Sequence, residues 1–112
     1  MFASFIELPP FERHREKYLD DGAFRLLQLH LMENPVAGDT IAGTGGLRKL
    51  RWSDENRGKG KRGGIRIIYY WLDGRYQFWL FTIYDKDEMS DLSPAQKKAL
   101  RALLENEKAK RR

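Results

Sequence analysis

Two neighbouring segments of the chain are apolar at nearly every position, and they constrain the fold more than any other feature. IRIIYYWL (65–72) and YQFWLFTIY (76–84) are each long enough for a strand, and only Asp73-Gly74-Arg75 separates them. A short connection containing Asp-Gly is typical of a β-hairpin. Strands that are apolar on both faces are typical of the centre of a sheet covered on each side. The sequence therefore predicts a central antiparallel hairpin with other elements packed on both of its faces.

The segments before the hairpin predict two more strands and two helices. Pro9-Pro10 ends a first aromatic and branched stretch, and a proline fits the first turn of the helix that follows. In RKLRW, strict alternation places Leu50 and Trp52 on one strand face and Lys49 and Arg51 on the other. The elements predicted here are a strand at 2–8, helices at 10–19 and 23–34, a loop at 35–46 and a strand at 47–52.

One helix is predicted after the hairpin. Ser93 suits the N-cap, Pro94 the first helical position, and Gln96 completes a capping box. Three leucines (Leu100, Leu103, Leu104) form its apolar stripe, and its end, KAKRR, is expected to fray. The order β-α-α-β-β-β-α predicts an α+β fold, a small and largely antiparallel sheet with two N-terminal helices and one C-terminal helix, in a single domain over 1–112. The residues expected in its core are Phe24, Leu27, Leu31, Ile67, Tyr69, Phe78 and Leu80.

Positive charge is concentrated in one short part of the chain. The whole chain has a formal net charge of +5, yet residues 48–66 alone carry a larger excess of cations. Such a focused positive field is typical of proteins that bind phosphate, RNA or DNA; a solvated loop that happens to be basic is the alternative. The cations are Arg48, Lys49, Arg51, Arg57, Lys59, Lys61, Arg62 and Arg66, and the acidic residues among them are Asp54 and Glu55.

The stretch RGKGKRGG (57–64) lies between two predicted strands, which makes it a hairpin loop and not a tether between domains. It lacks the Gly-Lys-Ser/Thr that opens a helix in a P-loop. Lys49 and Arg51 on one strand and Arg66 on the next add fixed cations at its base. We therefore predict a phosphate-handling surface in which a basic loop and strand-held arginines act together.

The sequence gives little support for a metal site, a membrane span, a catalytic histidine or a base-stacking platform. The chain has no cysteine, so it has neither disulfides nor thiolate metal ligands, and no metal or cofactor is expected. No apolar run approaches a membrane-spanning length, and the first residues lack the pattern of a signal peptide, so a cytoplasmic location is expected. His14 and His30 fall in predicted helices and are expected to be structural. The aromatic run at 69–71 can stack bases, but core packing is favoured.

Three stretches in sequence, GTGGLRKLR, GKGKRGGIRIIYY and IYDKDEMSDLSPAQ, together with the predicted element order, resemble the HigB branch of the RelE/ParE superfamily of bacterial toxins over nearly the whole chain. The resemblance implies the toxin of a type II toxin–antitoxin system, a metal-independent endoribonuclease that cleaves mRNA in the ribosomal A site and so inhibits translation and growth. It also implies a cognate antitoxin, expected to be a helix-turn-helix protein through which the toxin would contact operator DNA indirectly. A ParE-like gyrase poison and a non-catalytic RNA- or ribosome-binding module are the alternatives.

The resemblance also assigns expected roles. Lys49, Arg51 and Arg66 match the functional lysines of the second family strand and the arginine that opens the third. Lys86 matches a basic position after the last strand, whereas Asp87 and Ser93 stand where the RelE pattern has an arginine and a tyrosine. From their chemistry, the catalytic candidates are Arg66 as phosphate-charge stabiliser and Lys49, Lys59, Lys61 and Lys86 as candidate bases, with Tyr84 or Asp85 to relay a proton or orient a group. The RNA-binding candidates are Arg48, Arg51, Arg57, Lys59, Lys61 and Arg62.

Overall fold

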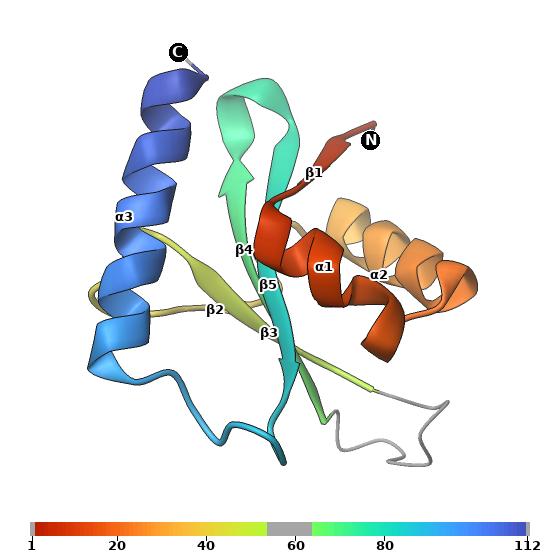
Figure 1. Cartoon of the computed structure of the whole chain (residues 1–112). Coiled ribbons are helices and arrows are strands. Elements are labelled where there is room, and N and C mark those ends of the chain that lie inside the picture. The colour runs from red at the N-terminus through yellow and green to blue at the C-terminus, as the bar shows by residue number, and fades with distance from the viewer. Residues whose placement is uncertain (1, 54–63, 112) are drawn as a thin grey trace.

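The computed structural model of the chain describes residues 2–53 and 64–111, and it shows a five-stranded sheet with helices on both faces (Figure 1). The strand order is β1-β5-β4-β3-β2, antiparallel except for the parallel pair of β1 and β5. The predicted α+β class and the predicted helices are therefore confirmed. The elements are β1 (Ser4–Glu7), α1 (Pro9–Tyr18), α2 (Asp21–Glu33), β2 (Asp39–Thr40), β3 (Arg48–Trp52), β4 (Ile65–Leu72), β5 (Gln77–Asp85) and α3 (Pro94–Lys110).

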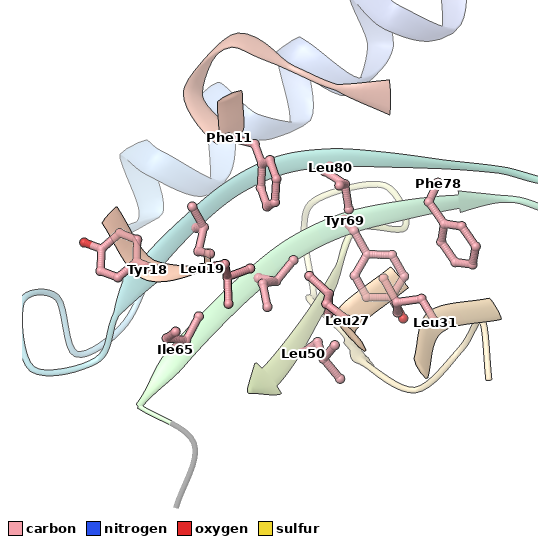
Figure 2. Packing of buried hydrophobic residues seen from close by; sticks show 12 residues of the cluster. Phe11, Tyr18, Leu19, Leu27, Leu31, Leu50, Ile65, Tyr69, Phe78 and Leu80 are labelled. Atoms are coloured by element: carbon pink, nitrogen blue, oxygen red, sulfur yellow. The ribbon is translucent and has the colours of Figure 1, made fainter. Parts of the chain in front are cut away.

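The central hairpin is covered on both sides, as its apolar faces predict. On one side of the sheet, α1 and α2 pack against Ile65, Ile67 and Tyr69 of β4. Figure 2 shows Ile65 and Tyr69 in this cluster. On the other side, α3 packs against residues that include Ile68 and Trp79. Six of the seven residues expected in the core are fully buried, whereas Phe24 is only partly buried. Residues 73–75 form a single 3₁₀ turn between β4 and β5.

Two differences from the predicted elements have a local physical cause. The stretch predicted as a loop at 35–46 contains β2, whose two residues pair with Lys49 and Arg48 of β3. A strand of two residues is too short to show alternation, which is why the sequence does not reveal it. Helix α2 begins at Asp21 because the carboxylate of Asp20 accepts a hydrogen bond from the backbone N–H of Ala23 at 2.8 Å, as an N-cap does.

A β-bulge in β5 changes which residues face α3. Ile68 of β4 pairs with Thr82, but the next residue, Tyr69, pairs with Leu80, so Phe81 is an extra residue. An extra residue reverses the in-and-out order of everything beyond it. Trp79 and Phe81 therefore face α3, and so does Tyr84, which strict alternation would place on the opposite side. The bulge thus turns Tyr84 toward the face that carries Lys49 and Arg66.

Helix α3 is fixed at both ends. The predicted capping box is present: Ser93 Oγ accepts from the Gln96 backbone N–H at 3.1 Å, and the Gln96 side chain accepts from the Ser93 N–H at 2.7 Å. The expected fraying of KAKRR is wrong for Lys108–Lys110, since the helix continues to Lys110, whereas Arg112 lies outside the described residues. Lys108 and Arg111 lie over the Tyr70 and Trp79 rings, and these contacts hold the last turn on the sheet. Of the helices the structure describes, none combines the length and the apolar character that crossing a bilayer requires.

Candidate functional site

A row of polar side chains crosses three strands at one end of the sheet. Arg51 of β3 pairs directly with Arg66 of β4, and Arg66 pairs with Tyr84 of β5. Directly paired residues lie on the same face with Cα atoms about 4.5–5.5 Å apart. Lys49 pairs with Ile68 and so shares this face, which is the side of α3. We call Lys49, Arg51, Arg66 and Tyr84 the basic row; the structure brings together four of the predicted site residues.

The basic row has two arginines at directly opposite strand positions. Like charges at such positions destabilise a sheet. A bound phosphate between the two guanidinium groups removes this repulsion and accepts hydrogen bonds from both. Arg66 Nη1 also donates to the carbonyl of Ile65 at 3.1 Å, which restrains its side chain at the start of β4. The arrangement therefore suits an anionic ligand.

Tyr84 contributes a buried hydroxyl to the row. The residue is only 6 % exposed, and its hydroxyl oxygen has no hydrogen-bond partner among the residues described. Burial raises the pKa of Tyr84 and the nearby charge of Asp91 raises it further, while Arg66 acts in the opposite direction. The phenol therefore stays protonated at neutral pH, and it can donate a proton or a hydrogen bond to a ligand in the row.

Asp91 is a site residue that sequence reasoning missed. Its Oδ1 lies 3.6 Å from Lys49 Nζ and accepts the Leu92 backbone N–H at 2.8 Å. The Leu92 N–H, and after it Lys49, lower the pKa of Asp91, so the carboxylate is charged at neutral pH. Asp91 therefore orients the Lys49 ammonium and offsets part of its charge. The only signal in the sequence is an acidic residue shortly before the N-cap Ser93.

Lys86 lies at the rim of the row, where β5 ends. Its side chain is exposed, and its backbone N–H donates to the carbonyl of Gly64 at 2.8 Å. Glu88, in the same connection, accepts from the Tyr18 hydroxyl at 2.7 Å and from Lys17 at 3.0 Å. These bonds tie the connection between β5 and α3 to helix α1. Lys86 is therefore held at the same end of the sheet as the basic row.

The other predicted residues are not gathered into the row. Arg48 points to the opposite face, where it pairs with Tyr69 and donates to the Gly38 carbonyl at 2.8 Å. Arg57, Lys59, Lys61 and Arg62 belong to 54–63, outside the described residues. His30 packs on the Trp52 ring at a centroid distance of 5.4 Å, away from the row. Tyr69 is fully buried, which confirms core packing for that part of the aromatic run.

Potential metal ligands are scattered in the described parts of the chain. Across 2–53 and 64–111, no three His, Asp or Glu side chains converge in a way that could hold a metal ion. The chemistry that the described site offers directly is that of two guanidinium groups, one ammonium and one neutral phenol. Groups of this kind can bind a phosphate, stabilise added negative charge on it and donate a proton to it.

The fold has known counterparts, although no protein-family model matches the chain. A free form of the E. coli toxin RelE with two arginines replaced by alanine aligns with a TM-score of 0.55 at 13% identity, over 80% of this chain and 90% of that one. The E. coli RelBE toxin–antitoxin complex aligns with a TM-score of 0.53 at 11% identity, over 75% of this chain and 96% of that one. The isolated E. coli RelE toxin gives 0.51 at 13% identity, over 91% and 99%. The chain thus has a RelE-like α+β fold.

Proposed function

We propose that the protein is the toxin of a type II toxin–antitoxin system, of the HigB type, and that it cleaves mRNA in the ribosomal A site. The observation that carries this proposal is the basic row, in which two arginines, a lysine and a buried neutral phenol share one face of a RelE-like sheet. Those groups match what phosphodiester cleavage needs: charge stabilisation and a proton donor.

The proposed chemistry assigns one step to each of these side chains. The 2′-oxygen of the RNA attacks the adjacent phosphorus, its proton leaves to a base, and the bond from phosphorus to the 5′-oxygen breaks. Arg66 is placed to neutralise the charge that builds up on the phosphate, with Arg51 beside it. Tyr84, neutral at pH 7, gives its proton to the departing 5′-oxygen. No metal enters this scheme.

The proton acceptor is a lysine in the proposal. Lys49 is paired with Asp91 and acts mainly as a fixed charge. Lys86, at the rim, and Lys59 and Lys61, in the basic loop, are the remaining candidates. A lysine acts as a base where neighbouring cations lower its pKa. Each of these three lysines is replaced by alanine in turn, and the cleavage rate is measured against pH. The base is the lysine whose replacement removes the rise of the rate with pH on the acidic side of the profile.

The ribosome and an antitoxin complete the proposal. A site that relies on charge and one phenol gains most of its rate from a substrate held in line for attack, and the ribosome can hold the mRNA in that way. We therefore expect little cleavage of free RNA. The E. coli RelBE structure contains a toxin with its antitoxin, which supports an antitoxin partner here, proposed to be a helix-turn-helix protein. A cytoplasmic location follows from ribosomal action.

The decisive experiment combines purified protein, ribosomes programmed with a defined mRNA, and mapping of RNA 5′ ends. The proposal requires cuts at the A-site codon, their loss in Arg66→Ala, and their retention in Arg25→Ala, an exposed arginine of α2. Replacing a non-bridging oxygen of the cut phosphate by sulfur tests metal use, because a thiophilic metal then restores cleavage only in metal-dependent enzymes. Ribosome binding without cuts would instead indicate a non-catalytic module. Inhibition of gyrase supercoiling would indicate a ParE-like poison.

A further inference from the structure

A second cationic site lies at the opposite end of the sheet from the basic row. The last turn of α3 lies beside the turn between β4 and β5 (Figure 1), and the two segments enclose an open pocket of about 230 Å³. Its floor is apolar and its walls are cationic. The lining residues are Leu72, Arg75, Trp79, Lys108 and Arg111, and we call this site the α3 pocket.

Arg111 is held in the α3 pocket by two contacts. Its Nε donates to Glu107 at 3.1 Å, and its guanidinium carbon lies 5.7 Å from the centre of the Trp79 ring. Glu107 is only 7 % exposed, so burial holds this carboxylate in place. The bond to Glu107 uses one edge of the guanidinium. The two terminal nitrogens carry the remaining N–H donors of the side chain, and Arg111 lines the pocket.

The other two cations lack acidic partners in the described part of the chain. Neither Arg75 nor Lys108 forms an ion pair with any residue of 2–53 or 64–111; Lys108 Nζ lies 5.1 Å from the Tyr70 ring centre instead. Glu107 offsets the charge of Arg111, so Arg75 and Lys108 supply the excess positive charge at the pocket, and two like charges there repel each other unless an anion lies between them. The α3 pocket therefore has the charge of a site for an anionic group.

We propose that the α3 pocket binds a backbone phosphate of RNA, as a contact separate from the basic row. Two arginine forks favour a phosphate, whose oxygens accept paired hydrogen bonds, and the Leu72–Trp79 floor suits the ribose attached to it. Leu72 is six residues along β4 from Arg66, about 20 Å at the rise of a strand. One phosphate cannot reach both sites. The inference shares RNA with the proposed function but does not depend on cleavage.

The first test uses inorganic phosphate on the isolated full chain. Millimolar phosphate is expected to shift the indole N–H resonance of Trp79 in an NMR titration. The double variant Arg75→Gln/Lys108→Gln should abolish the shift. The control, Arg25→Gln/Lys98→Gln, lowers the net charge equally at exposed positions on α2 and α3 and should leave the shift intact. No shift in the wild type, or an equal loss in both variants, would overturn the proposal.

The second test uses a short single-stranded RNA. Fluorescence anisotropy is expected to show about tenfold weaker binding by Arg75→Gln/Lys108→Gln than by the control, with a salt slope smaller by about 0.7 for each RNA phosphate that the variant no longer neutralises. Equal affinities and slopes would overturn the RNA assignment. So would a polyglutamate peptide that shifts the Trp79 resonance at lower concentration than the RNA, because the pocket would then prefer acidic peptide.

The same variants separate this inference from the proposed function. If the wild type fails to cut ribosome-bound mRNA but still shows the Trp79 response to phosphate and RNA, the proposed function fails and the α3 pocket stands. The opposite outcome is that the wild type cuts mRNA, and that Arg75→Gln/Lys108→Gln cuts it with the same dependence on protein concentration and binds RNA with the same affinity. The proposed function then stands and the α3 pocket proposal fails. A melting temperature equal to that of the wild type confirms that the double variant is folded.

Discussion

Replacing Tyr84 by phenylalanine should make the protein more stable and less active. The hydroxyl is buried and has no partner among the described residues. A buried hydroxyl without a hydrogen bond costs about 1–3 kcal/mol, so its removal should raise the free energy of unfolding by about 1 kcal/mol or more. For a chain of this length, 1 kcal/mol corresponds to a melting temperature higher by about 4 °C. The ring keeps its packing beside Leu92 in both forms.

Cleavage should fall in the same variant because phenylalanine has no proton to donate. Loss of a general acid lowers the rate by about 10²–10⁴-fold. Thermal unfolding and single-turnover cleavage on programmed ribosomes, measured on one purified sample, give both quantities. Activity should be lost although the folded fraction rises, which separates a chemical role from a structural one.

Tyr69→Phe is the matched control. The Tyr69 hydroxyl donates to the Pro35 carbonyl at 2.8 Å and accepts from the Gly38 N–H at 3.0 Å. Removing the hydroxyl at Tyr69 should therefore lower the free energy of unfolding by about 1–3 kcal/mol. If Tyr84→Phe lowers the melting temperature as Tyr69→Phe does, the Tyr84 hydroxyl has a partner and the reasoning is wrong. If Tyr84→Phe cuts mRNA at the wild-type rate, the Tyr84 phenol is not the proton donor.

Four further outcomes are expected. Arg66→Ala should slow cleavage about a hundredfold with a smaller loss of ribosome affinity, and Arg66→Lys should restore only part of the rate in the same assay. Gly38→Ala should lower the unfolding free energy by about 1–3 kcal/mol in urea titrations, since a Cβ there would lie 2.9 Å from both the Lys49 carbonyl and the Tyr69 ring. Burial raises the pKa of Tyr69 above its usual value of 10.0, so the folded state favours the neutral phenol. The contribution of Tyr69 to the free energy of unfolding should therefore be constant below pH 10 and fall above it. Thermal melts at rising pH measure this fall, which should be less steep in Tyr69→Phe. Neutralising Lys59, Lys61 and Arg62 together should flatten the salt dependence of ribosome binding, and an unchanged slope would make that loop a mere connector.

Local patterns were enough to predict most of the fold. The two-faced apolar character of 65–72 and 76–84 predicts a covered central hairpin, because a strand that is apolar on both faces cannot leave either of them in water. The capping box at Ser93 is equally local, since all of its atoms lie within four residues. Alternation in 47–52 predicts correctly that Leu50 and Trp52 share one face, which in the structure is the side of α1 and α2.

The gathering of the site was decided by tertiary structure. Alternation alone places Tyr84 on the wrong face, because one extra residue at Phe81 reverses the order and a bulge leaves no mark in an apolar run. Alternation by itself does place Arg48 on the face opposite Arg51, as the structure confirms. Asp91, by contrast, meets Lys49 across segments far apart in the sequence, in a connection that Glu88 ties to α1.

The last turn of α3 also shows the difference between what local sequence predicts and what tertiary contacts decide. The residues of KAKRR are good helix formers, but the last turn of a helix near a chain end is expected to fray. Lys108 and Arg111 are ordered because strands β4 and β5 present the rings of Tyr70 and Trp79 to them, from positions far earlier in the chain. Local sequence determines which residues can form a helix or a strand, whereas contacts between distant segments determine which charged side chains meet, since those contacts depend on register and packing that no short window contains.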